Sequence, residues 1–398
     1  MEGLDIARAL RAVAGADPTA VPAAVAGLAA ELGATDVVLY LVDFSQTTLV
    51  PVGDGSAGEL VRSDVASEDV GTTAAGRCFL EQAPLTLDKG GVLRVWVPVV
   101  QGSERTGVLA LTVAGVPGEV VPACEELGML AGYLIATHSR GTDHYQRCRS
   151  RRALSLAASM QWDLLPPLVL RTSRLSLAAL VEPAYDIGGD CFDYATDDVT
   201  LDLAVMDAMG HGVPSALTAA LTVGSYRHDR RERRPIEEIH ANLDRAVAAH
   251  TVQPAFSTGQ LARVDLATGV MSWTNAGHPL PMLVRGGKVV RELDCPPTLP
   301  WGLGALAEGG ATVTVATEAL EPGDAVLFYT DGVVEAESPG GEEFGVGRLA
   351  DVVGRAASDS LEPESIARLV VRSVLEHQSD LLVDDATLFL FRWGERSG

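Results

Sequence analysis

Residues 201–221, LDLAVMDAMGHGVPSALTAAL, read as a strand, a tight turn and a helix in direct succession. The apolar run that ends at Asp207 predicts a buried strand. Gly210 and Gly212 predict a turn, because glycine adopts backbone conformations that are closed to other residues. Pro214 suits the first turn of the helix that follows. The segment therefore predicts an α/β (α+β) fold in which a strand delivers an aspartate to a glycine turn.

Three further segments bring an aspartate to the edge of a strand-like run. They are YDIGGDCFDY (185–194), DAVLFYTDGVVEA (324–336) and LLVDDATLFLF (381–391), which supply Asp190, Asp331 and the pair Asp384 and Asp385. A single aspartate at a strand end is usually a turn former or a helix cap. Several carboxylates at one sheet edge repel each other, raise one another's pKa and persist by binding cations. Oxygen ligands without His or Cys select Mg²⁺ or Mn²⁺, and two such ions can support phosphoryl transfer.

Taken together, the motifs of the C-terminal half resemble those of the metal-dependent PP2C-like protein phosphatases of the bacterial SpoIIE/RsbU type. The likeness spans about residues 155–393 and rests on SMQWDLLPP, IGGDCFDY, DAMGHGVPSALTAAL, NAGHPLPML, PWGLG, LEPGDAVLFYTDGVVEA, FGVGRL and DDATLFLF, in that order. It implies an α-β-β-α sandwich over residues 171–398 that hydrolyses phosphoserine or phosphothreonine on a protein. The substrate implied by kinship is a phosphorylated STAS-type anti-sigma-factor antagonist.

The resemblance also implies roles for the first two aspartates. Asp207 should bridge two Mn²⁺ or Mg²⁺ ions, with the main-chain carbonyl of Ala208 as a further ligand. Asp190 should bind one ion directly or through water. Many relatives have glycine at the position of Ala208. A carbonyl ligand needs no particular side chain, so we expect the site to survive if φ is negative there.

Asp331 and Asp384 should complete the other ion site, with Asp385 as the alternative to Asp384 because the two are adjacent. His211 is a candidate general acid, but a histidine between two glycines is more simply explained as part of the turn. Nothing around Cys191 suggests an activated thiolate, and we expect this side chain to lie in the core.

Residues 1–140 alternate helical and strand-like patterns. An Ala-rich helix is expected over 20–32 and ends at Gly33, and strands are expected over 37–42, 47–52, 92–100 and 107–113. The pattern RVWVPVVQGSERTGVLALTV ahead of the helix EELGMLAGYLIA resembles a GAF domain, which implies a sensor with a small-molecule ligand. The alternative is a generic α/β dimerisation domain.

Residues 141–170 are predicted to form a helical linker that Pro166 and Pro167 end. Apolar stripes over 127–135 and 154–165 predict a homodimer, because a lone connecting helix could not bury them. The alternative is that each stripe packs on its own domain.

The composition limits the function classes that are open to the chain. Its 398 residues suggest two or three domains, and its net charge of −23 excludes a nucleic-acid-binding protein that works by bulk charge. We find no run of eighteen apolar residues and no secretory leader, so we expect a cytoplasmic protein without a membrane span. Two other functions stay open: a catalytically silent signalling protein of the same fold, and a hydrolase of small phosphorylated molecules.

Overall fold

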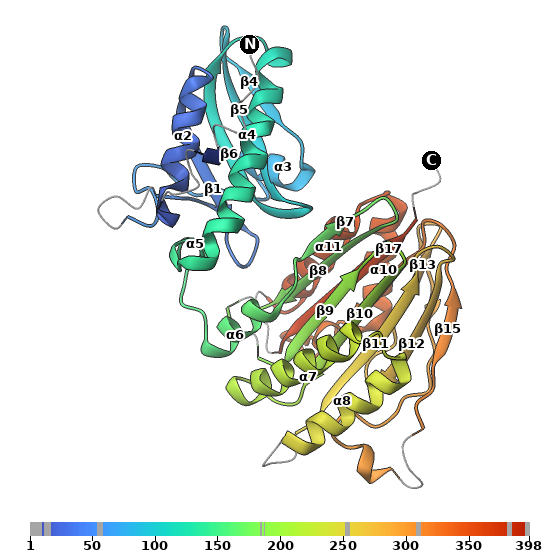
Figure 1. Cartoon of the computed structure of the whole chain (residues 1–398). Coiled ribbons are helices and arrows are strands. Elements are labelled where there is room, and N and C mark those ends of the chain that lie inside the picture. Colours follow the sequence, from blue (N-terminus) through green and yellow to red (C-terminus); the bar gives the residue numbers. More distant parts are fainter. Residues whose placement is uncertain are drawn as a thin grey trace. The chain divides into compact units, whose positions relative to one another are not determined.

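The computed structural model describes residues 10–11, 17–53, 59–183, 185–186, 188–250, 255–307, 312–379 and 384–394 (Figure 1). The chain divides into two compact units, Met1–Ala153 and Leu154–Gly398. The division falls inside the segment 141–170 that we predicted as a linker.

The first unit is built on a six-stranded antiparallel sheet with the strand order β3-β2-β1-β6-β5-β4. Its strands are β1 (Ala34–Val42), β2 (Thr48–Pro51), β3 (Glu68–Asp69), β4 (Leu85–Asp88), β5 (Val92–Gln101) and β6 (Glu104–Ala114). Its helices are η1 (Pro18–Ala20), α2 (Val21–Glu31), α3 (Ala74–Glu81), α4 (Pro117–His138), η3 (Ser139–Gly141) and α5 (His144–Arg149). Helices α2 and α4 pack on one face of the sheet and α3 on the other.

Helix α4 is the longest of the helices described in this unit. With η3 it is the one helix in the described part of the chain whose length and composition could span a membrane, with a mean hydropathy of 1.3 and 56% of that stretch buried. Leu127, Leu130 and Leu134 lie in the core against the sheet. The stripe over 127–135 therefore packs on its own unit, and our reason for placing a dimer contact there was wrong.

The second unit contains two antiparallel sheets. The five-stranded sheet has the order β15-β12-β11-β10-β9 and the six-stranded sheet the order β14-β13-β16-β17-β8-β7. The strands are β7 (Val169–Arg171), β8 (Leu175–Glu182), β9 (Asp190–Thr196), β10 (Thr200–Ala208), β11 (Ser257–Asp265), β12 (Val270–Ala276), β13 (Met282–Arg285), β14 (Lys288–Glu292), β15 (Ala316–Ala319), β16 (Ala325–Tyr329) and β17 (Ala386–Trp393).

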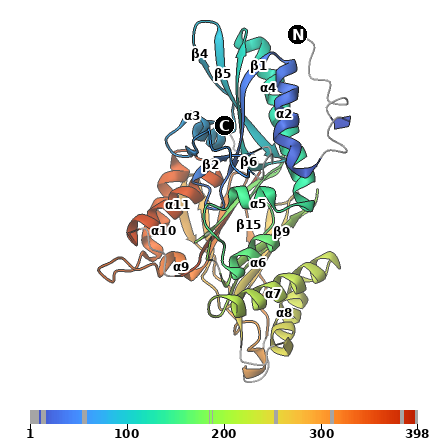
Figure 2. The ribbon, with the colours of Figure 1, turned by 90° about the vertical axis from the view of Figure 1, so that its left-hand side faces the viewer.

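Helices cover the outer faces of these two sheets (Figure 2). The helices of this unit are α6 (Leu156–Leu164), α7 (Val213–Arg231), α8 (Ile236–His250), η4 (Gly304–Leu306), α9 (Asp331–Val334), α10 (Gly345–Ser358) and α11 (Pro363–His377). Helices α7 and α8 pack on the five-stranded sheet, and α10 and α11 pack on the six-stranded sheet. The α-β-β-α order predicted from the sequence is confirmed.

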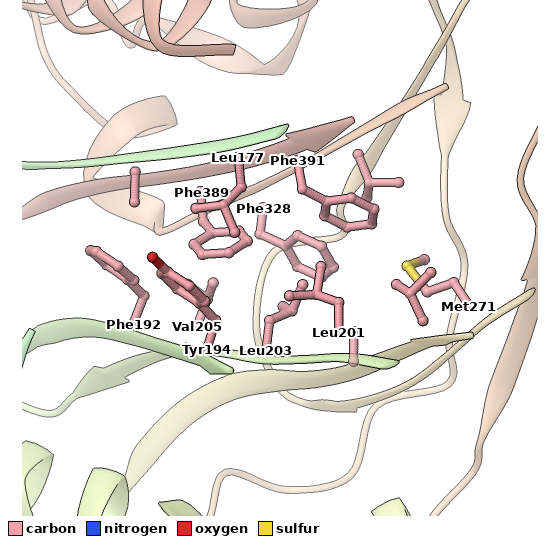
Figure 3. Packing of buried hydrophobic residues seen from close by; sticks show 14 of the residues in the cluster. Leu177, Phe192, Tyr194, Leu201, Leu203, Val205, Met271, Phe328, Phe389 and Phe391 are labelled. Carbon is pink, nitrogen blue, oxygen red and sulfur yellow. The ribbon is translucent and has the colours of Figure 1, made fainter. Parts of the chain in front are cut away.

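The inner faces of the two sheets meet in an aromatic core (Figure 3). Phe328 and Phe391 stack there with ring centroids 6.5 Å apart. Their neighbours Leu327 and Leu390 point the other way, toward α10 and α11. Alternate residues of a strand face opposite sides, so a strand buried on both faces needs an unbroken apolar run. This is why the runs before Asp331 and after Asp385 carry no polar alternation.

Helix α6 belongs to the second unit. It ends one residue before Leu165 and the proline pair, as predicted. Ala158 lies in the core between the sheets, and Gln161 is completely buried. The stripe over 154–165 is therefore also used within its own unit, so neither stripe supports the homodimer that we predicted from them.

Candidate active site

The predicted aspartates lie where both sheets end at a common edge. In the five-stranded sheet, Asp190 opens β9 and pairs across the ladder with Asp207 near the end of β10. In the six-stranded sheet, Asp331 opens α9 two residues after β16. Asp384 and Asp385 directly precede β17, which pairs with β16. Segments far apart in the sequence thus bring five carboxylates to one edge.

Asp190 is the most deeply buried of the five, with 2% of its surface exposed. The hydroxyl of Thr330 donates a hydrogen bond to Asp190 Oδ2 at 2.6 Å, and the Thr387 amide donates to Thr330 Oγ1 at 2.9 Å. Burial raises the pKa of Asp190 well above its ordinary value, and the negative charges of Asp207 and Asp385 add to the increase. The carboxylate is fixed in place but lacks a compensating charge.

Asp207 lies at the centre of this negative charge. Burial raises its pKa to about 7, with further contributions from Asp331, Asp384 and Asp385. Ala208 ends the strand and is not among the residues with positive φ. This is the backbone condition that we set for a carbonyl ligand at Ala208.

Gly188 and Gly189 let the loop before Asp190 pack against the turn that follows β10. A Cβ on Gly189 would lie 2.4 Å from the Ala208 carbonyl oxygen, and one on Gly188 would lie 2.7 Å from the Gly212 amide nitrogen. Gly212 has φ +74°, and the turn exposes His211 to solvent. Close backbone approach thus requires glycine at 188 and 189, whereas positive φ favours glycine at 210 and 212.

The remaining three aspartates differ in their surroundings. Burial and then the charge of Asp384 raise the pKa of Asp331. Asp384 is exposed, and its Oδ1 accepts a hydrogen bond from the Asp385 amide at 2.9 Å. Asp385 Oδ2 accepts hydrogen bonds from the amides of Gly188 at 2.7 Å and Gly189 at 2.9 Å. Of these three aspartates, Asp385 is the one with a described side-chain hydrogen bond to the loop of the other sheet.

The donor set fits a hard divalent cation. Among the described residues, the side-chain charges that shift the pKa values of Asp190, Asp207 and Asp331 are all negative, and none comes from arginine, lysine or histidine. Carboxylates and a carbonyl are ligands that Mg²⁺ and Mn²⁺ prefer. As the side chains stand, no three His, Cys, Asp or Glu of the described residues have the spacing of a formed metal site. Small side-chain movements are therefore needed to close a coordination shell.

Nearby polar residues have structural roles. The Asn275 side chain accepts a hydrogen bond from the His278 amide at 2.7 Å and donates one to the His278 carbonyl at 2.9 Å. Burial lowers the pKa of His278 to about 3, so its ring is neutral at physiological pH. Cys191 is fully buried, as expected. These residues shape the core beside the site.

Sequence reasoning missed two of the residues that hold the site together. The hydroxyl of Thr330 orients Asp190, and the Thr387 amide in turn orients that hydroxyl. Gln161 of α6 also supports the site, because its Nε2 donates to the Gly188 carbonyl at 3.0 Å. The available signal was the position of both threonines within two residues of a predicted aspartate.

A family model described as "Stage II sporulation protein E (SpoIIE)" matches residues 197–394. This part of the chain is a PP2C-like phosphatase domain of the SpoIIE/RsbU type. The match begins after Asp190, so it covers less than the span of about 155–393 over which the motifs suggested the likeness. Asp207, Asp331, Asp384 and Asp385 lie inside it.

Curated relatives extend the SpoIIE-type likeness further toward the N-terminus. The phosphoserine phosphatase RsbU of Bacillus subtilis is 23% identical over 269 residues, which cover 66% of this chain and 77% of RsbU. Protein IcfG of Synechocystis is 23% identical over 268 residues, 60% of this chain but only 41% of IcfG. The SiaA-PP2C domain of Pseudomonas aeruginosa has the same fold, with a TM-score of 0.50 and 23% identity over 60% of this chain and 94% of that domain.

Proposed function

We propose that this SpoIIE-type phosphatase hydrolyses phosphoserine or phosphothreonine on a bacterial regulatory protein and depends on two Mn²⁺ or Mg²⁺ ions. The observation that carries the proposal is the set of aspartates at one sheet edge with no balancing cation. Desolvated carboxylates without a partner are costly to keep ionised, and bound divalent ions remove that cost.

The chain's residues would divide the ligand roles as follows. Asp207 pairs with Asp190 in its own sheet and is close enough to the aspartates of the other sheet for their charges to raise its pKa. It would therefore bridge both ions, with the Ala208 carbonyl beside it. Asp190 would serve one ion directly or through water, since its Oδ2 already accepts the Thr330 hydroxyl. Asp331 and Asp384 would serve the other. When bound, two such ions activate a water and stabilise charge on the phosphoryl oxygens.

The leaving seryl or threonyl oxygen requires a proton. His278 is not its source, because its ring is neutral and buried. His211 is exposed on the turn beside Asp207, where a bound phosphoprotein could reach it. We nevertheless assign His211 to the turn, and expect the proton to come from water.

The natural substrate and setting are inferred from kinship. We propose a phosphorylated STAS-type anti-sigma-factor antagonist as substrate, and the likeness to the phosphoserine phosphatase RsbU supports the phosphoserine part of this proposal. The order of strands and helices in the first unit supports a GAF-like domain. A small-molecule ligand for this domain and a cytoplasmic location are further parts of the proposal. We still propose a homodimer, although the two apolar stripes no longer support it. Sedimentation of the full chain at micromolar concentration tests this proposal.

Helix α6 is the proposed route of control between the two units. Its N-terminus is tied to the loop before Asp190, because the Ser155 amide donates to the Tyr185 carbonyl at 2.9 Å. Gln161 holds the Gly188 carbonyl further along the same loop. A change in α6 would therefore alter the placement of Asp190 and with it the affinity for metal.

Turnover of a phosphorylated protein and of an aryl phosphate tests the activity. Both should require added Mn²⁺ or Mg²⁺, stop with a chelator, and disappear in Asp207→Asn. Asp198→Asn is the matched control, because Asp198 is an exposed aspartate in the turn between β9 and β10. Full turnover by Asp207→Asn or by the metal-free protein would exclude the mechanism. Turnover of nucleotides but not of phosphoproteins would favour a small-molecule hydrolase.

Control by the first unit is tested with a fragment that begins at Leu154. The fragment must retain α6, because Ala158 belongs to the core between the sheets. If the fragment and the full chain show the same metal dependence and turnover, α6 is only a tether.

A further inference from the structure

Asp384 and Asp385 are adjacent, yet their side chains have different surroundings. Asp385 Oδ2 accepts hydrogen bonds from the Gly188 and Gly189 amides, and the Asp190 amide lies 3.5 Å away. Three successive backbone donors thus converge on one carboxylate oxygen. Asp384 is exposed, and none of its described contacts engages another loop.

The loop that Asp385 holds has contacts on its opposite side as well. The Ala208 amide donates to the Gly189 carbonyl at 3.1 Å, in register with the pairing of Asp207 and Asp190. A Cβ on Gly189 would also lie 3.1 Å from Asp207 Oδ1. The loop is therefore held between Asp385 and the end of β10, and its position sets the separation of Asp190 from Asp207.

We propose that Asp385 is a positioning residue and that Asp384 alone of the pair is a metal ligand. Asp385 Oδ2 accepts two or three N–H bonds, so its lone pairs are occupied, and those donors present positive charge where a cation would have to approach this oxygen. Asp385 acts instead through Asp190, by fixing the loop that carries it. This assignment rests on the proposed metal-dependent function.

Three variants of the full-length protein separate the two roles. In Asp385→Asn the amide oxygen can still accept from Gly188 and Gly189, whereas Asp385→Ala removes the acceptor. Asp384→Asn makes the same chemical change at the neighbouring position and is the matched control. The readout is Mn²⁺ stoichiometry and affinity by isothermal titration calorimetry, which does not depend on turnover.

Asp385→Asn should keep the wild-type number of Mn²⁺ ions, with an affinity within about threefold, since one neutral acceptor replaces a charged one. Asp385→Ala should keep that number but bind at least about tenfold more weakly, because two buried amides lose their partner. Asp384→Asn should lose an ion. A parallel comparison of kcat at saturating Mn²⁺ should rank Asp385→Asn above Asp384→Asn.

Loss of an ion in Asp385→Asn would overturn the assignment, and so would wild-type affinity in Asp385→Ala. If Asp385→Ala does not fold, the contrast between the two asparagine variants still decides. A wild-type protein that binds no Mn²⁺ would overturn the proposed function and this assignment together. Wild-type Mn²⁺ binding with loss of an ion in Asp385→Asn overturns the assignment alone.

Discussion

Asp207 should make the metal-free protein less stable as pH rises. Burial and neighbouring negative charges raise its pKa from 3.8 to about 7. A carboxyl group whose pKa is raised by folding holds its proton more tightly in the folded state, so its ionisation weakens the fold. The loss of stability begins as pH rises above the unfolded-state pKa and is complete above the folded-state pKa.

The magnitude follows from these two pKa values. Between about pH 5 and about pH 7.5, this group should lower the free energy of unfolding by up to about 2.5 kcal/mol. For a unit of this size that is a fall of about 5 °C in Tm.

Other groups titrate in the same pH range and change the free energy of unfolding in the opposite direction. Burial lowers the pKa of His240 to about 4, so its contribution to stability increases with pH. The comparison must therefore be made against Asp207→Asn.

The assay is thermal unfolding in the presence of a chelator over this pH range. The Tm of the wild type should fall by about 5 °C relative to that of Asp207→Asn, and Asp198→Asn should behave as the wild type. Added Mn²⁺ at about pH 7.5 should raise the Tm of the wild type but not that of Asp207→Asn, because ligands that bind only the folded state stabilise it. Equal pH slopes for wild type and Asp207→Asn would refute the electrostatic reasoning.

Three further variants and one control variant test the surroundings of the site. Gln161→Leu should raise the Mn²⁺ concentration for half-maximal activity by about fivefold, since it removes a buried hydrogen bond worth about 1 kcal/mol; an unchanged metal titration would exclude α6 as the route of control. Gly189→Ala should abolish metal-dependent turnover because its Cβ would meet the Ala208 carbonyl oxygen at 2.4 Å. Gly224→Ala, whose Cβ would meet nothing within 4 Å, should remain active. His211→Ala should lower kcat by less than about a hundredfold, and a greater loss would identify it as the general acid.

The local features of the fold and site could be read from the sequence. Gly33 and the turn glycines 210 and 212 have the positive φ angles that their positions indicated. The apolar runs became strands buried on both faces, because a strand between two layers needs apolar residues at every position. Asp190 and Asp207 stand at the strand ends where their motifs put them. Each of these features depends mainly on residues that are close together in the chain, and these can be identified directly from the sequence.

Only the tertiary structure decided which surface each apolar stripe packs against. The stripe over 127–135 has the same pattern whether it meets its own sheet or a second copy of the chain. Periodicity reports that a face is apolar but does not identify its partner. The structure buries Leu127 and Leu134 within the first unit, so this stripe gives no basis for the predicted dimer contact.

The same limit applied to the adjacent aspartates. Two neighbouring carboxylates are chemically alike in the sequence, and successive residues of an extended chain point in different directions. Which of them reaches the loop of Asp190 depends on the pairing of β17 with β8 and β16. The partner of Asp385, the Gly188 amide, is 197 residues away in the chain. The sequence alone therefore determined that a carboxylate cluster forms at this edge, whereas long-range strand pairing decided which carboxylate of the pair holds the loop.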